Sequence, residues 1–118
     1  MWVRGDAGRL EQVFFNLLTN ARTHGSSVRA IDVRLRRVDG AVALEVQDYG
    51  RGIADDQLPH LFARFYQVAR ADRLAQGGLG LGLFLCQELV AAHGGRIAVA
   101  SGVEEGTTVT VWLPLLDP

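Results

Sequence analysis

The sequence has no lysine, although it contains twelve basic residues, and it has a single cysteine. A Walker A phosphate loop ends in Gly-Lys-Ser or Gly-Lys-Thr, so the missing lysine excludes that loop. One cysteine excludes an internal disulfide and suits a reducing compartment. Because Cys86 falls in an apolar helical pattern, we expect a small core residue there.

Long apolar runs are also missing. No run approaches the roughly 18 residues of a membrane span, and the N-terminus has no signal-peptide pattern. The formal net charge of −1 gives no general attraction to nucleic acid or to an anionic membrane. The 118 residues, of which 48% are hydrophobic, suffice for one domain with a two-layer core. We therefore expect a single domain over residues 1–118 that contacts neither nucleic acid nor membrane.

The glycine-rich stretch Gln76–Leu83, with the sequence QGGLGLGL, has four glycines within six residues. Helical apolar spacing follows it. A glycine loop that opens a helix suits anions, because free backbone N–H groups and the positive end of the helix dipole face the ligand. A dinucleotide-binding loop is excluded, since the polar residues 70–76 stand where a strand is required. A flexible turn before a packed helix is the alternative that this run leaves open.

A first helix is predicted from Ala7 to about His24, capped by Asp6. Its apolar stripe recurs at spacings of three and four residues, through Leu10, Val13, Phe14, Leu17, Leu18 and Ala21. Asn16 and Asn20 lie one turn apart at the edge of this stripe. Their amides are either satisfied polar groups at the core boundary or groups that bind a cation and phosphate oxygens.

Alternating apolar residues predict a sheet. Residues 30–47 form an antiparallel hairpin around Asp39-Gly40, with one buried face. We also predict a short strand end at 2–4, a second helix from Leu81 to about His93, and strands at 96–100 and 107–113. This order predicts an α+β fold, a two-layer α/β sandwich with the helices on one face of a mixed, mostly antiparallel sheet.

A carboxylate ends the second hairpin strand, and glycines alternate after it: Asp48, Gly50 and Gly52. A buried carboxylate is costly unless it is hydrogen-bonded, and the exocyclic amine of a purine would satisfy it. An Asx-type turn that leaves the sheet is the alternative. Farther along, residues 61–66 form an aromatic cluster, and the polar residues 67–76 are a candidate lid.

Five short motifs follow one another along the chain, at residues 6–21, 48–53, 62–66, 78–83 and 106–108. They resemble the N, G1, F and G2 boxes and the final Gly-Thr element of the ATP-binding catalytic domain of sensor histidine kinases. That domain belongs to a superfamily with DNA gyrase B, the Hsp90 chaperones and MutL, and it has the Bergerat ATP-binding fold. One such motif alone is weak evidence for the family, whereas five in the family's order and spacing are strong evidence. The resemblance covers nearly the whole chain.

The resemblance implies individual roles. Asp48 would bind the adenine amine with Thr107 nearby, Asn20 would ligate Mg²⁺, and Asn16 would sit beside the metal and its waters. Backbone amides of the glycine-rich stretch would face the phosphates, and Arg70 or Arg73 would reach them when the lid closes. The implied nucleotide-binding residues are Asp48, Gly50, Gly52, Ile53, Phe65, Tyr66, Arg70, Arg73, Gly78, Leu79, Gly80, Leu81, Gly82, Leu83 and Thr107.

The resemblance also implies an activity: a protein-histidine kinase that transfers the γ-phosphoryl group of Mg-ATP in two-component signalling. The hydrolytic members of the superfamily place a Glu at the position of Asn16, and an amide is a poor general base, which favours transfer over hydrolysis. His24, His60 and His93 lack the context of a phosphoacceptor. We therefore expect the acceptor on a separate phosphoacceptor and dimerisation domain of the same kinase, with a response regulator downstream. The expected location is the cytoplasm, in a free protein or in the cytoplasmic part of a membrane-anchored sensor.

One departure from the family pattern keeps other functions open. These kinases often carry Lys or Arg three residues after the second Asn, where this chain has Thr23. A degenerate or regulatory nucleotide-binding module that acts through protein contact is therefore an alternative. A gyrase-type ATPase is another, which Asn16 disfavours.

Overall fold

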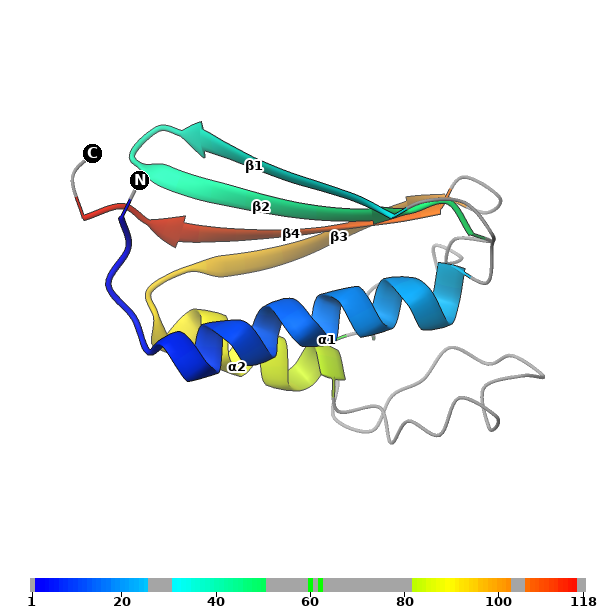
Figure 1. Cartoon of the computed structure of the whole chain (residues 1–118), viewed down its shortest axis with the longest axis horizontal. Helices are drawn as coiled ribbons and strands as arrows, with labels where there is room; N and C mark the ends of the chain where they lie inside the picture. Colours follow the sequence, from blue (N-terminus) through cyan, green and yellow to red (C-terminus); the bar gives the residue numbers. More distant parts are fainter. Residues whose placement is uncertain are drawn as a thin grey trace.

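A computed structural model describes residues 2–25, 31–50, 60, 62, 82–102 and 106–116. The candidate lid, most of the aromatic cluster and the glycine-rich stretch before Gly82 lie outside these residues. The elements, in chain order, are α1 (Ala7–Gly25), β1 (Asp32–Val38), β2 (Ala41–Asp48), α2 (Gly82–Ala92), β3 (Arg96–Gly102) and β4 (Gly106–Pro114). The strands form one layer and both helices lie against one face of it, which confirms the predicted two-layer α+β fold (Figure 1).

Helix α1 begins where the sequence predicts. The Asp6 carboxylate accepts a hydrogen bond from the Arg9 N–H at 3.1 Å, which satisfies one of the unpaired donors of the first turn. Val13, Leu17 and Ala21 face the sheet and are at most 6% exposed. The buried stripe is narrower than predicted, because Phe14 is 37% exposed at its margin.

The described strands have the order β1-β2-β4-β3, and each of their three pairings is antiparallel. Asp39 and Gly40 both have positive φ, 45° and 79°, as a two-residue type I′ hairpin turn requires. The strand end predicted at residues 2–4 is wrong: this segment is not part of the described sheet. A backbone hydrogen bond from the Leu116 N–H to the Trp2 carbonyl, at 2.8 Å, joins this segment to the residues that follow β4.

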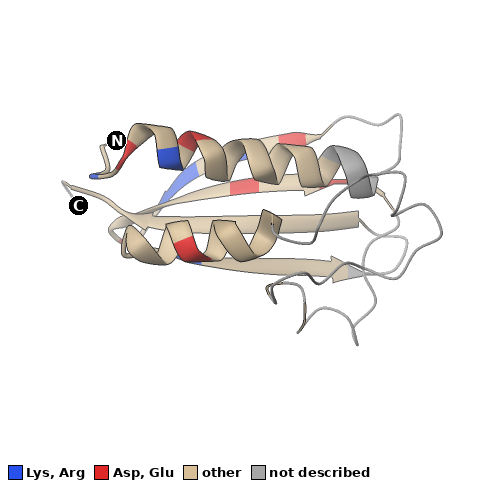
Figure 2. Ribbon diagram, turned by 90° about the horizontal axis from the view of Figure 1, so that it is seen from below, with Lys and Arg blue, Asp and Glu red and all other residues tan. Residues whose placement is uncertain are grey.

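The core lies between the helices and the three strands β2, β4 and β3. Helix α1 packs on β2 and β4, and α2 packs on β3 and β4, so the two helices lie side by side across the sheet (Figure 2). The buried residues of this core are Val13, Leu17, Ala21, Val46, Cys86, Val90, Val109 and Val111. Cys86 is 0% exposed, which confirms it as a core residue.

The helices do not cover the outer strand β1. The prediction that one face of the hairpin is buried is therefore wrong for this strand. Val33 and Leu35 lie opposite Val46 and Leu44, so they point to the helix side of the sheet. Yet their exposed fractions are 45% and 61%. The reason is position, because β1 lies at the edge of the described sheet while α1 packs on the two strands beyond it.

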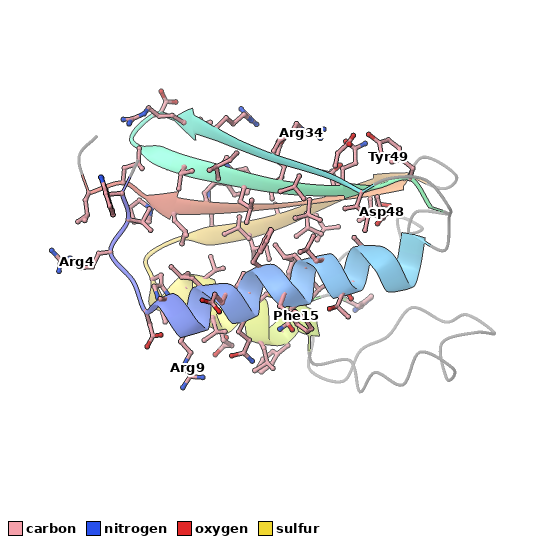
Figure 3. The ribbon with its side chains drawn as sticks, viewed as in Figure 1. Arg4, Arg9, Phe15, Arg34, Asp48 and Tyr49 are labelled. Carbon is pink, nitrogen blue, oxygen red and sulfur yellow. The ribbon has the colours of Figure 1, made fainter. Side chains whose placement is uncertain are left out.

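The other face of the sheet carries paired charges. The Glu45 carboxylate accepts hydrogen bonds from Arg36 and Arg34, both at 3.0 Å, and these bonds lower the pKa of Glu45. Arg34 points away from the helices (Figure 3). On the same face, the Arg96 guanidinium lies 3.8 Å from the centre of the Trp112 ring. The arginine side chains of the two ion pairs are 46% and 56% exposed, so the contribution of these pairs to stability is small.

His93 connects the start of α1 to the end of α2. One ring nitrogen, Nδ1, is 2.7 Å from the Leu89 carbonyl oxygen, and the other, Nε2, accepts the Asp6 N–H at 3.1 Å. Gly5 permits this approach, since a Cβ there would lie 2.7 Å from His93 Cδ2. Neither helix that the structure describes is long and apolar enough to cross a membrane.

Candidate functional site

A cavity opens at the end of the sheet where β2 stops and β4 begins. It holds about 360 Å³ of empty space, part of it open to solvent. Its described lining residues are Leu17, Asn20, Ala21, Val46, Asp48, Leu83, Val99, Thr107 and Val109. The walls are therefore mainly apolar, with three polar side chains, which is the usual character of a small-molecule site.

Asp48 is a buried carboxylate in the wall of this cavity. It ends β2 and is 5% exposed (Figure 3). Its Oδ1 accepts the Gly50 N–H at 2.9 Å and the Thr107 N–H at 3.2 Å. The Gly50 bond is the Asx-type turn that the sequence offered as an alternative. The turn fixes the carboxylate, and the cavity gives this fixed carboxylate an open side, so the two interpretations are compatible.

Gly106 brings β4 close to this carboxylate. Its φ is 85°, and a Cβ at this position would lie 2.3 Å from the Asp48 backbone oxygen. Glycine is therefore required both by the backbone conformation and by the space. The close approach sets Thr107 directly opposite Asp48 in the β2–β4 pairing.

Ser101 lies beside the cavity wall, in contact with Thr107, and the sequence argument did not single it out. It lies opposite Thr107 in the β3–β4 pairing, and the two hydroxyl oxygens are 2.8 Å apart. The alternation of β3 was the available signal. Ile97 and Val99 both pack against the core, and the same period brings Ser101 to that face at the strand's end.

The two asparagines of α1 have different surroundings. Asn20 lines the cavity with Asp48 and Thr107. Asn16 lies one turn earlier, close to the Cys86 thiol. Burial raises the pKa of this thiol to about 11, and the nearby Asn16 amide offsets part of that effect. The thiol itself donates to the Val13 carbonyl at 3.7 Å.

Five of the residues that the sequence predicted for nucleotide binding are described by the structure. Asp48, Thr107 and Leu83 line the cavity, Gly50 bonds to Asp48, and Gly82 is the first residue of α2. The other predicted residues lie outside the described residues: Gly52, Ile53, Phe65, Tyr66, Arg70, Arg73, Gly78, Leu79, Gly80 and Leu81.

The chemistry of the cavity fits an adenine nucleotide. Apolar walls suit a flat base, and a fixed carboxylate accepts hydrogen bonds from an exocyclic amine. An asparagine oxygen is a suitable ligand for Mg²⁺, which is usually held by one or two protein oxygens together with phosphates. The described ranges contain no group of three or more His, Cys, Asp or Glu side chains that could hold a metal by itself.

Comparison with known proteins agrees with this geometry. The family described as "Histidine kinase-, DNA gyrase B-, and HSP90-like ATPase" matches residues 5–117. The chain is 42% identical over 113 residues to the signal transduction histidine-protein kinase BaeS of Escherichia coli, which covers 96% of the chain but only 24% of BaeS.

Two solved structures have the same fold. The mycobacterial sensor histidine kinase MprB superposes with a TM-score of 0.84 at 30% identity, over 95% of this chain and 76% of that one. Full-length ShkA in complex with AMPPNP superposes with a TM-score of 0.78, also at 30% identity, over 91% of this chain and 21% of that one. The chain therefore belongs to the family of histidine kinase-, DNA gyrase B- and HSP90-like ATPases, and has the fold of a histidine kinase catalytic domain.

Proposed function

We propose that the chain binds Mg-ATP in this cavity and transfers the γ-phosphoryl group to a histidine. One observation carries the proposal: Asp48 is buried and held by two backbone N–H groups in a cavity that it shares with Asn20 and Thr107. A buried carboxylate needs such partners, and its orientation suits a ligand that donates hydrogen bonds. The complex of the structural neighbour ShkA with an ATP analogue supports the choice of nucleotide.

Each described residue has a defined task in this proposal. Asp48 and Thr107 orient the base, and the apolar residues around them exclude water from it. Asn20 would hold Mg²⁺, and the metal would supply neutralisation of the phosphate charge. Asn16 would lie beside it. Outside the described residues, the proposal gives the glycine-rich stretch contacts with the phosphates, and Arg70 or Arg73 the role of an added cation.

Transfer is proposed over hydrolysis because of Asn16. A hydrolase needs a base that activates water, and an amide cannot serve as one at neutral pH.

The acceptor histidine is proposed to belong to a phosphoacceptor and dimerisation domain of the same kinase, with a response regulator downstream. The chain spans 24% of the length of BaeS, so most of such a kinase would lie outside these residues. The proposal makes this domain a monomeric cytoplasmic unit without nucleic-acid or membrane contacts of its own.

Titration calorimetry with AMPPNP, with and without Mg²⁺, tests nucleotide binding. We expect binding that strengthens with Mg²⁺ and falls at least tenfold in Asp48→Asn, because the amide replaces half of the acceptor capacity by a donor. Asp39→Asn is the matched control: the same chemical change in an exposed turn that tolerates Asn. Equal affinity in the two variants would remove Asp48 from the site and contradict the proposal.

Phosphoryl transfer needs a second assay. A phosphoacceptor domain of a sensor histidine kinase is supplied with radiolabelled ATP, and label on its histidine is measured. We expect label with the wild-type chain and little with Asn20→Ala. Steady release of phosphate without label on the acceptor would instead indicate an ATPase. Nucleotide binding with neither reaction would favour the regulatory module.

A further inference from the structure

Two hydrogen bonds of the Ser101 hydroxyl lie where β3 and β4 approach the cavity. Its Oγ donates to the Gly106 carbonyl oxygen at 2.9 Å, and it lies 2.8 Å from Thr107 Oγ1. Ser101 is part-buried, and Thr107 is 9% exposed and lines the cavity. The Ser101 hydroxyl thus lies behind one of the three polar groups of the cavity wall.

The direction of these two bonds follows from counting hydrogens. A hydroxyl has one hydrogen to donate, and a carbonyl oxygen can only accept. Because the Ser101 hydrogen is used on Gly106, the bond between the two hydroxyls must be donated by Thr107. The Thr107 oxygen then offers only its acceptor capacity to a molecule in the cavity.

With the bond in this direction, the polar side chains of Asp48 and Thr107 both act as hydrogen-bond acceptors toward the cavity. The Asp48 carboxylate, which accepts the Thr107 N–H through Oδ1, also has only acceptors to offer. At position 6 of the ring, a 6-aminopurine presents an N–H donor to such a wall, whereas a 6-oxopurine presents a carbonyl oxygen, which is an acceptor. Leaving a buried acceptor without a donor costs more free energy than a typical hydrogen bond gains. The two acceptors of the wall should therefore favour the base with a donor at position 6.

We infer that Ser101 is a positioning residue that holds the Thr107 hydroxyl as an acceptor and so sharpens selection of adenine over 6-oxopurine nucleotides. The inference rests on the proposed nucleotide site and names a determinant of its base specificity. Without Ser101, the Thr107 hydroxyl is free to turn and donate to the oxygen of a 6-oxopurine. The expected effect is therefore on the ratio of affinities for the two bases.

The test is titration calorimetry with ADP and inosine diphosphate in the presence of Mg²⁺. These nucleotides carry identical phosphates and sugars, so the ratio of their dissociation constants isolates the base. In Ser101→Ala we expect the preference for ADP to fall by about three- to tenfold, the range set by one hydrogen bond. Ser101→Thr keeps a hydroxyl and should retain the wild-type ratio. A purely structural role would lower both affinities and leave the ratio unchanged.

A second background isolates the route through Thr107. In Thr107→Val, adding Ser101→Ala should leave the ratio unchanged, because the hydroxyl that Ser101 orients is already gone. Should Ser101→Ala not fold, Ser101→Val and Ser101→Thr form a matched pair of similar shape, and the ratio should fall in the valine variant alone.

The outcomes separate this inference from the function beneath it. ADP binding with a ratio that Ser101→Ala changes by less than twofold would overturn the inference and leave the nucleotide site standing. A persistent effect of Ser101→Ala in the Thr107→Val background would also overturn it. A wild-type chain that binds neither ADP nor AMPPNP would overturn the proposed function, and this inference with it.

Discussion

Gly106→Ala should destabilise the domain by about 3 kcal/mol. The φ of 85° lies in the left-handed region, which costs a residue with a side chain about 1–2 kcal/mol. The new Cβ would also lie 2.3 Å from the Asp48 backbone oxygen and 3.0 Å from Tyr49 Cα. Backbone atoms cannot rotate aside, so the strands must separate. Losing one hydrogen bond at this end of the β2–β4 ladder adds about 1 kcal/mol.

Urea unfolding at pH 7 measures this loss. We expect a lower midpoint at an unchanged slope, since the folded and unfolded surfaces stay the same. Gly8→Ala, in the first turn of α1, is the control: its Cβ would meet only the Asp6 carboxylate at an ordinary 3.4 Å. This control should be neutral or gain up to about 1 kcal/mol from helix propensity. A loss below 1 kcal/mol in Gly106→Ala, or similar losses in the two variants, would refute the steric argument.

Two further predictions concern the core. Leu17→Ala should lower the free energy of unfolding by about 2–5 kcal/mol, because Leu17 is 1% exposed. Leu35→Ala, at a residue that is 61% exposed, should cost under about 1 kcal/mol; equal losses would show that β1 is covered after all. The third prediction concerns pH. Because burial raises the pKa of Cys86 from 9.0 to about 11, the unfolded chain releases this proton first as pH rises. Stability should therefore fall between pH 9 and 11 by about 1 kcal/mol per pH unit more in the wild type than in Cys86→Ala. Parallel stability curves over this window would contradict the assigned cause.

Much of the fold could be predicted because it depends on local signals. The Asp6 cap, the period of α1 and the Asp39-Gly40 turn each need only neighbouring residues, and the structure confirms all three. The exposure of Val33 and Leu35 could not be predicted in this way. Alternation shows which side chains share a face, but it does not show how far a helix extends across that face.

The residues of the site also fall into those that local sequence signals predict and those that only the three-dimensional arrangement reveals. Asp48, Asn20 and Thr107 were predicted through motifs and do share one cavity. Ser101 carries no motif, and its place beside Thr107 appears only through the β3–β4 register. The separate surroundings of Asn16 and Asn20 were also out of reach, because both lie at the same edge of α1 and only α2 distinguishes them.

The two bonds of His93 determine what this histidine cannot do. Because the Leu89 carbonyl can only accept a hydrogen bond, His93 Nδ1 carries the ring proton. Nε2 is then the unprotonated nitrogen, and its lone pair accepts the hydrogen bond from the Asp6 N–H. Phosphorylation requires a ring nitrogen with an available lone pair, and the only lone pair of this tautomer is occupied. A phosphoryl group could bond to His93 only after the start of α1 had separated from the end of α2. This histidine therefore joins the two helices and is unsuited to accept the phosphoryl group.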